Sequence, residues 1–470
     1  MLEPSLQYQS LKTVLQHIDA NIRFQISLRM PSIRSVERVV PIKMNYLDLR
    51  DGKTKVNDTS YELWVVRHYP EGDTPRQVES ENISGTRKCD YDEFGFPVFC
   101  RNMLLPGDIS FRDENWTEHR FDTEEDERRN RQELRILEKA LERRTELRSQ
   151  RIRVKDYIRN LEPLPNDELN REENLVRNRL EFIHKSLRWF IENAKLEILP
   201  FDCRLNNTKP PFTCYIQLTT TNGENKQIQR FEYTKKLYEA VKHLNDVFFG
   251  SRTMPIRIKR LDIFGFSGQI CRLPTGVRFY VHKAHVSNSS VAHRNFPLFV
   301  ENVDNLDCLW MHAWGQAIVQ SPASRNAKRI VIVGRKPREM QELMQVIREL
   351  SNVEIFFVPV KFSSYDYFRR PEDTIFLPED YFQLIQAWLA GDRRVGASWW
   401  MGIGDEEKAR EILELVQTRT ERTERIERCV TIRRDDSTKV EIFYEPFKRP
   451  IRKYYDITCE WVMKFRIVQT

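Results

Sequence analysis

Three features that would identify a class of protein directly are missing from this 470-residue sequence. No stretch approaches the roughly 20 apolar residues that a membrane-spanning helix needs, and the first residues lack the pattern of a secretory signal. The eight cysteines stand singly between Cys89 and Cys459, without the CxxC pairs of structural zinc or thioredoxin-like chemistry. We therefore expect a folded protein of the cytoplasm or nucleus, with free thiols and no membrane contact.

A strong excess of one charge is also missing. The net charge of +7 is small beside 76 basic and 69 acidic side chains, so the sequence predicts a surface of mixed sign. Basic runs at residues 148–159 and 448–453 could contact phosphates, but solvated surfaces explain them more simply. A nucleic-acid-binding protein is therefore an alternative and not the favoured interpretation.

Glycine-rich phosphate loops are incomplete. The turn Gly402-Ile403-Gly404 joins an apolar strand pattern to a helical one, but it lacks a third glycine and is followed by three acids, Asp405 to Glu407. Carboxylates at a helix N-terminus occupy the place that a phosphate would take. We interpret this turn as structural and expect no nucleotide cofactor. A nucleotide-binding enzyme built on it is the second alternative.

Catalytic and metal-binding patterns are weak as well. His282, His285 and His293 lie close in sequence without a glutamate or cysteine at ligand spacing, so we assign no metal site. Ser267 lies in GFSG, which is not the GxSxG of a nucleophile elbow. We therefore assign no catalytic residue and expect that the protein is not an enzyme.

The first helical pattern raises the question of docking. Its apolar residues recur on one helix face: Leu11, Val14, Leu15 and Ile18. A second pattern ends at Pro31 and is apolar on two sides: Ile22, Ile26 and Met30 on one, Phe24 and Leu28 on the other. A short helix with two apolar sides has two partners, one of which can be another protein. The segment is either a docking module or an ordinary pair of N-terminal helices.

Strand and helix patterns follow in a clear order. Asp51-Gly52 between alternating runs predicts a hairpin, in a small antiparallel meander that reaches Tyr69. From about residue 123 to 194 charge dominates, and acids at 124–127 mark the start of a long helix. Two apolar seams around a break at 162–168 predict an antiparallel, coiled-coil-like hairpin. Its charge density indicates an arm outside the core.

Beyond residue 196 strand patterns alternate with helical patterns, which indicates helices packed on a sheet. The fold class is thus a mixture of α+β and α/β. We expect four segments: helices at 1–41, a β-rich segment with an ordered loop at 42–122, the charged hairpin at 123–195 and a C-terminal α/β domain at 196–470.

Several stretches resemble one known family. Residues 10–42, VNDTSYELWVVRHY, LLPGDISFRDENW and LIQAWLAGDRRVGASWWMGI look like the nematode-expanded F-box C family, in the same order and over nearly the whole chain. The resemblance implies an F-box-like N-terminus that binds the Skp-type adaptor of a cullin ubiquitin ligase, joined to an F-box-associated-like domain for an unknown protein substrate. The adaptor-binding residues that it implies are Leu6, Leu11, Val14, Leu15, Ile18, Phe24 and Ile26.

Overall fold

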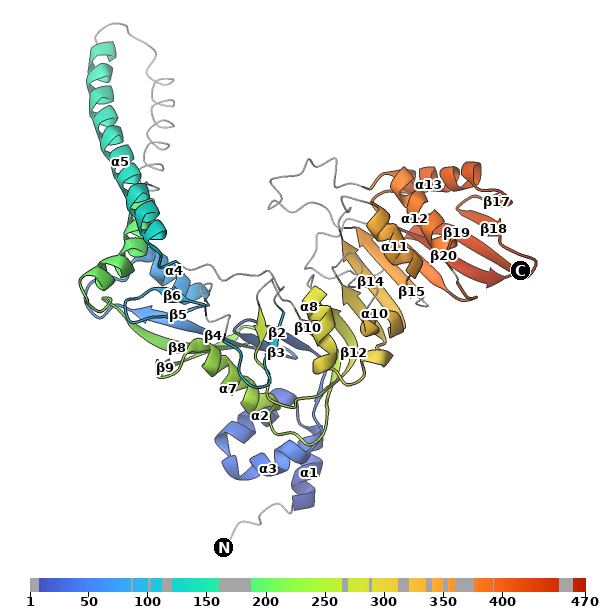
Figure 1. Cartoon of the computed structure of the whole chain (residues 1–470), viewed down its shortest axis with the longest axis horizontal. Helices are drawn as coiled ribbons and strands as arrows, with labels where there is room; N and C mark the ends of the chain where they lie inside the picture. The colour runs from blue at the N-terminus through green and yellow to red at the C-terminus, as the bar shows by residue number, and fades with distance from the viewer. Residues whose placement is uncertain are drawn as a thin grey trace.

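The chain combines helices with one large mixed sheet, which confirms the mixed α and β fold class (Figure 1). The computed structural model describes residues 8–85, 88–99, 103–111, 121–159, 187–263, 269–286, 290–311, 321–334, 340–349, 354–359, 376–391, 393–447 and 460–470.

The helices have the following bounds: α1 Tyr8–His17, α2 Ala20–Arg29, α3 Arg34–Val39, α4 Arg76–Ser84, α5 Glu124–Arg159, α7 Leu237–Phe249, α8 Ser290–Asn295, α10 Pro322–Asn326, α11 Met340–Glu349, α12 Pro378–Leu389 and α13 Glu406–Arg419. A further helix covers residues 187–205. Short 3₁₀ turns are η1 Pro31–Ile33, η2 Phe296–Leu298 and η3 Val303–Asn305.

The strands of the first half are β1 Lys43–Met44, β2 Leu47–Arg50, β3 Lys53–Val56, β4 Thr59–His68, β5 Asp90–Tyr91, β6 Pro97–Val98, β7 Ile109–Ser110, β8 Thr213–Asn222 and β9 Asn225–Glu232. Those of the second half are β10 Ile256–Ile263, β11 Ile270–Cys271, β12 Phe279–Val286, β13 Cys308–Met311, β14 Arg329–Gly334, β15 Glu354–Pro359, β16 Ser398–Ile403, β17 Thr423–Ile426, β18 Cys429–Arg433, β19 Thr438–Pro446 and β20 Trp461–Gln469.

The main sheet is parallel in its middle and antiparallel at both ends. Its order is β17-β18-β19-β20-β16-β15-β14-β13-β12-β10-β2-β3-β4-β8-β9, with β1 also on β10. From β10 to β16 each strand runs parallel to its neighbour, the usual arrangement where strands alternate with helices. The strands beyond β16 and beyond β2 are antiparallel.

The predicted meander is confirmed in β2, β3 and β4, with Asp51-Gly52 at its first turn. Gly52 has a φ of 63°, the left-handed region that such a hairpin turn needs. The meander does not stand alone, because β2 pairs with β10 and β4 pairs along its length with β8. In space the segments 42–122 and 196–470 therefore share one sheet.

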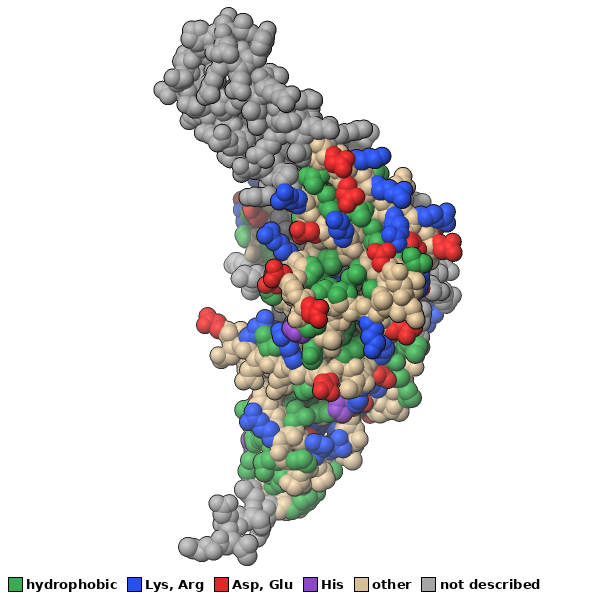
Figure 2. Space-filling model, turned by 90° about the vertical axis from the view of Figure 1, so that its left-hand side faces the viewer, with side chains coloured by type: hydrophobic (Ala, Val, Ile, Leu, Met, Phe, Trp, Pro, Cys, Tyr) green, Lys and Arg blue, Asp and Glu red, His purple; other side chains and the backbone are tan. Residues whose placement is uncertain are grey.

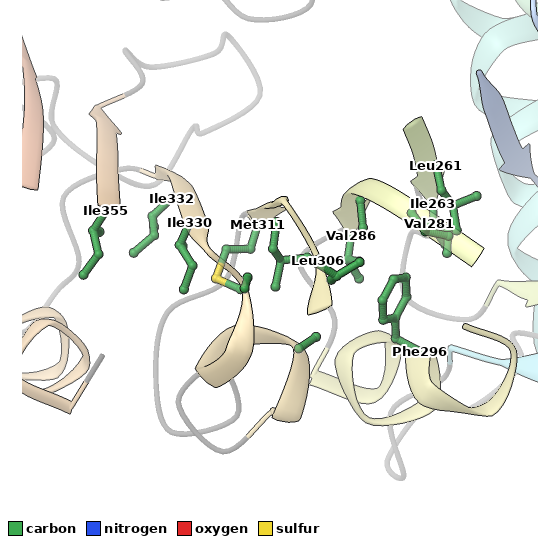
Figure 3. Packing of buried hydrophobic residues seen from close by; sticks show 14 of the residues in the cluster. Leu261, Ile263, Val281, Val286, Phe296, Leu306, Met311, Ile330, Ile332 and Ile355 are labelled. Atoms are coloured by element: carbon green, nitrogen blue, oxygen red, sulfur yellow. The ribbon is translucent and has the colours of Figure 1, made fainter. Parts of the chain in front are cut away.

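The main core lies between the sheet and the helices on one of its faces. Figure 3 shows this layer, where Leu261, Val286, Met311 and Ile330 of successive parallel strands lie in a row, with Phe296 below the right-hand end of the row. All five side chains are buried, in the same large apolar cluster. The parallel strands gain their stability from this shared layer, since burial of apolar area is the main favourable contribution to folding.

The charged segment begins as predicted, with a long helix from Glu124 (Figure 1). Two ion pairs tie α5 to the helix 187–205: Arg131 lies 2.7 Å from Asp202, and Glu138 lies 3.8 Å from Lys195. The residue number rises from 131 to 138 along α5 while that of the partner falls from 202 to 195, so the two helices run antiparallel. Residues 160–186, which include most of the second predicted seam, lie outside the described residues.

The arm should be dispensable for folding. The ion pair between Glu138 and Lys195 brings the two helices together, so a Gly-Ser linker of about four residues can replace residues 139–194. We expect the shortened protein to keep one cooperative thermal transition within a few degrees of the full chain. A control that removes α11 should lose the transition, because Leu343 and Ile347 of that helix are buried in the main core. Loss of the transition on arm removal would show that the arm supports the body.

In the described part of the chain, no helix combines the length and the apolar character that a bilayer crossing requires. Helix α5 is long but highly charged.

The cysteines in the described part of the chain are free thiols, and Cys89, Cys203, Cys271 and Cys308 are buried. Burial raises the pKa of the Cys271 thiol to about 12 and that of Cys308 to about 11, so both thiols are protonated at neutral pH.

Candidate partner-binding surface

The helices α1 and α3 close a small core of their own. Leu15 of α1 packs with Val36 and Val40, and Leu11 and Ile18 pack partly against the same cluster. The short helix α3 was not predicted, because six residues after a proline give no clear period. The apolar face predicted on the first helix is thus largely satisfied within the chain.

The helix α2 is attached to the body through Phe24. Its ring stacks on Phe248 of α7 with centroids 4.5 Å apart and meets Phe249 edge-on at 6.2 Å. Phe24 is only 1% exposed and belongs to the main core. The protein itself therefore covers Phe24, although Leu28 on the same predicted side is 48% exposed.

A buried ion cluster fastens the same segment. The Arg23 Nε donates to Glu37 Oε1 at 3.0 Å, and the Arg252 guanidinium donates to both oxygens of Glu37 at 2.9 and 3.0 Å. All three side chains are at most 4% exposed. Burial lowers the pKa of Arg23 and of Arg252, and Glu37 opposes this by stabilising both charges. The buried guanidinium groups of Arg23 and Arg252 thus share Glu37 as their counter-charge.

Backbone capping and amide contacts fix the start of α2. Asp19 is the N-cap and accepts a hydrogen bond from the Asn21 backbone N–H at 2.8 Å. The Asn21 side chain donates to the Val56 carbonyl at 3.0 Å and accepts from the Tyr61 hydroxyl at 3.1 Å. The N-terminal segment is therefore joined to the meander as well as to α7.

The apolar side chains that this segment leaves open are mostly not the predicted ones. Those about half exposed are Tyr8 51%, Val14 46%, Ile22 51%, Leu28 48% and Met30 52%. Of the predicted adaptor-binding residues, Val14 is exposed, whereas Leu11, Ile18 and Ile26 are half-buried. Leu15 and Phe24 are 1% exposed and are covered within the chain, and their part in adaptor binding stays a prediction. Leu6 lies outside the described residues.

The Gly402 turn has the acidic cap that the sequence predicts. The strand β16 ends at Ile403, and Asp405 caps α13 by accepting a hydrogen bond from the Lys408 backbone N–H at 2.7 Å. The Gly402 carbonyl accepts a hydrogen bond from the Tyr381 hydroxyl at 3.0 Å. The carboxylate of Asp405 thus already holds an amide at the helix N-terminus where a phosphate would bind.

Millimolar ATP, GTP or NAD should therefore leave the melting temperature unchanged. The Lys408 amide in the first turn of α13 already donates to Asp405, and Glu406 and Glu407 add negative charge there. A nucleotide at about 100 times its dissociation constant would stabilise the protein by about 2.7 kcal/mol, which a thermal-shift assay detects. A saturable rise that disappears in a folded Gly404→Val variant would contradict this interpretation.

The histidines are spread over several surroundings. His282 lies 3.2 Å from Asp307 at the surface, whereas His285 of β12 and His293 of α8 are buried. Within the ranges that the structure describes, no three metal-ligand side chains come together. The GFSG stretch and the basic run 448–453 lie outside those ranges, as do the side chains of the basic run 148–159.

A polar cluster that sequence reasoning missed lies at the junction of β2 and β10. Asp48 and Asp262 are paired neighbours on these parallel strands, and both are 2% exposed. Arg50 Nε donates to Asp48 Oδ1 at 2.9 Å, and Arg260 Nε donates to Asp262 Oδ1 at 2.6 Å. The Tyr46 hydroxyl donates to Asp262 at 2.9 Å, and its pKa is raised by burial and by that carboxylate. The cluster therefore joins the meander to the C-terminal strands, with one arginine beside each of the two aspartates.

A sequence signal for this cluster does exist. Asp48-x-Arg50 and Arg260-x-Asp262 each place opposite charges two residues apart, on one side of a strand. What the sequence lacks is any indication that the two strands are neighbours.

Comparison with known families recognises the middle of the chain. Residues 236–405 match a domain of unknown function, DUF3557. The match runs from the residue before α7 to the N-cap of α13, and so takes in the parallel strands β10 to β16. No curated protein and no solved structure matches the chain. The N-terminal helices and the charged arm lie outside the DUF3557 region.

Proposed function

We propose that this chain is a non-catalytic protein-interaction protein of the cytoplasm or nucleus. In this proposal α1 to α3 form an F-box-like docking segment for the Skp-type adaptor of a cullin ubiquitin ligase. The C-terminal α/β part or the arm then engages a protein substrate. The partner's identity comes from the resemblance of the chain to the F-box C family.

The observation that carries the proposal is a group of apolar side chains that the N-terminal segment leaves exposed. Phe24 attaches α2 to α7, whereas Ile22, Leu28 and Met30 are about half exposed. Hydrophobic side chains also gather at the lower end of the molecule in Figure 2, where the N-terminal helices lie. Amphipathic helices with apolar anchors at helical spacing are a common means of docking to another protein.

Co-purification of the adaptor with the full chain tests the proposal. We expect the wild-type protein to retain the adaptor and the double variant Val14→Asp, Leu28→Asp to lose it, because two charges would enter an apolar interface. Both side chains are about half exposed, so the variant should keep the melting temperature of the wild type.

The matched control places the same charges elsewhere. Leu205 and Leu298 are 78% and 63% exposed on the body of the protein. The variant Leu205→Asp, Leu298→Asp should bind the adaptor like the wild type. An intact protein that never retains the adaptor would overturn the ligase proposal, and steep salt-dependent binding to DNA or RNA would favour the nucleic-acid alternative.

A further inference from the structure

The strand β9 forms one end of the main sheet. Its only neighbour among the strands that the structure describes is β8, so within that part of the chain its outer edge is unpaired. All residues of β9 from Asn225 to Glu232 are exposed, including Ile228 and Phe231 at 50% each. Figure 2 looks at the molecule from the side on which β8 and β9 lie in Figure 1.

This edge lacks most of the usual protections against pairing. Edge strands are commonly short, bulged or interrupted by proline. By contrast, β9 has eight residues without proline, and each pairs with β8 in an unbroken register from Asn225 to Glu232. We propose that β9 pairs antiparallel with β9 of a second copy of this chain, so that one sheet continues across a two-fold axis.

The charges of β9 select one register for this pairing. In an antiparallel pair, two residues that lie opposite each other either both point their backbone amides toward the other strand or both point them away. Amide direction alternates along a strand, so in a pair of identical strands the two-fold axis must pass between two copies of the same residue. We call that residue the centre of the pair. A centre on Gln229 places Lys226 opposite Glu232 of the second copy, twice, and uses residues 226–232. A centre on Ile228 would oppose Lys226 and Arg230, and a centre on Arg230 would oppose that residue with itself. Only the Gln229 centre gives opposite charges over so long a pair.

A groove next to β9 fits the same register. The groove has a volume of about 570 Å³ and lies between α2 and the tip of the β8–β9 hairpin, with Ile22, Gln25, Thr220 and Gln227 among its lining residues. The Gln229 centre places Phe231 of the second copy opposite Gln227, on the sheet face that α2 and α7 cover. Each groove can therefore receive the half-exposed phenyl ring of the other copy.

Sedimentation of the full chain over a concentration series tests the proposal. We expect a reversible dimer for the wild type. Lys226→Glu places Glu opposite Glu232, and Glu232→Lys places Lys opposite Lys226. Each variant should raise the dimer dissociation constant about tenfold, because two cross-strand attractions become repulsions.

Charge reversal provides matched controls. The double variant Lys226→Glu, Glu232→Lys restores the opposite charges and should recover the wild-type dissociation constant. An equimolar mixture of the two single variants should form a heterodimer, since each then offers the charge that the other lacks. A wild-type chain that stays monomeric at about 100 μM, a dimer insensitive to the single variants, or a double variant without recovery would each overturn the proposal.

Discussion

Replacing Glu37 by alanine should lower the free energy of unfolding by about 3 to 5 kcal/mol. This carboxylate is the shared partner of Arg23 and Arg252, and all three side chains are at most 4% exposed. Without it, two guanidinium groups whose pKa burial already lowers would face each other with no counter-charge. Urea unfolding followed by circular dichroism measures the effect.

Two further variants distinguish the effect of a buried ion pair on stability from the effect of an ion pair at the surface. Glu379 and Arg419 form an ion pair at the surface, with 48% and 49% of their side chains exposed, so Glu379→Ala should cost only about 0 to 1 kcal/mol. Glu37→Gln keeps the shape of the side chain but removes its charge, and should lose most of the stability that Glu37→Ala loses. Equal effects of Glu37→Ala and Glu379→Ala would show that the buried cluster does not stabilise the fold.

Phe24→Ala should cost a similar amount, about 3 to 5 kcal/mol, because a buried aromatic ring leaves a cavity when it is truncated. The ring is 1% exposed and stacks on Phe248 at 4.5 Å, so neighbouring rings cannot readily fill the space. The N-terminal helices α1 to α3 should then open from α7 before the sheet unfolds. Hydrogen exchange of the α2 amides, compared with those of α7, would detect this order.

The matched substitution is Phe190→Ala, whose side chain is 47% exposed on the helix 187–205. Phe190→Ala should lower the free energy of unfolding by well under half as much as Phe24→Ala, since it removes less buried apolar area. The Arg252 guanidinium lies 6.0 Å from the Phe24 ring, so Phe24→Ala and Glu37→Ala should not be additive. Strict additivity in the double variant would show that the apolar and ionic attachments act independently.

Local patterns predict the elements of this fold well. Asp51-Gly52 identifies the first hairpin, and the alternation of strand and helix after residue 196 predicts helices packed on a sheet. The neighbours of the strands are not encoded locally. Nothing in the residues of β2 indicates that it lies beside β10, and the four residues of β13 give too short a pattern to recognise.

At the candidate binding surface, too, the sequence predicts the local element but not what packs against it. Helical spacing correctly indicates that Leu15 and Phe24 lie on apolar faces, but spacing does not say whether the covering partner belongs to the same chain. Leu15 is covered by Val36 of the unpredicted helix α3, and Phe24 by Phe248, more than 200 residues away in sequence. The residues left open, such as Leu28 and Met30, are identified only once those internal contacts are known.

The pairing of β2 with β10 has a consequence for synthesis on the ribosome. Tyr46 and Asp262, which meet at this junction, are 216 residues apart. At about 5 to 20 residues per second, translation needs roughly 10 to 45 s to supply the second of them. From β10 onward, by contrast, each parallel strand pairs with one made shortly before it. The nascent meander must therefore wait with its β4 edge unpaired until β8 is made and with its β2 edge unpaired until β10 is made. This interval is when chaperones that recognise exposed apolar strands would bind the chain.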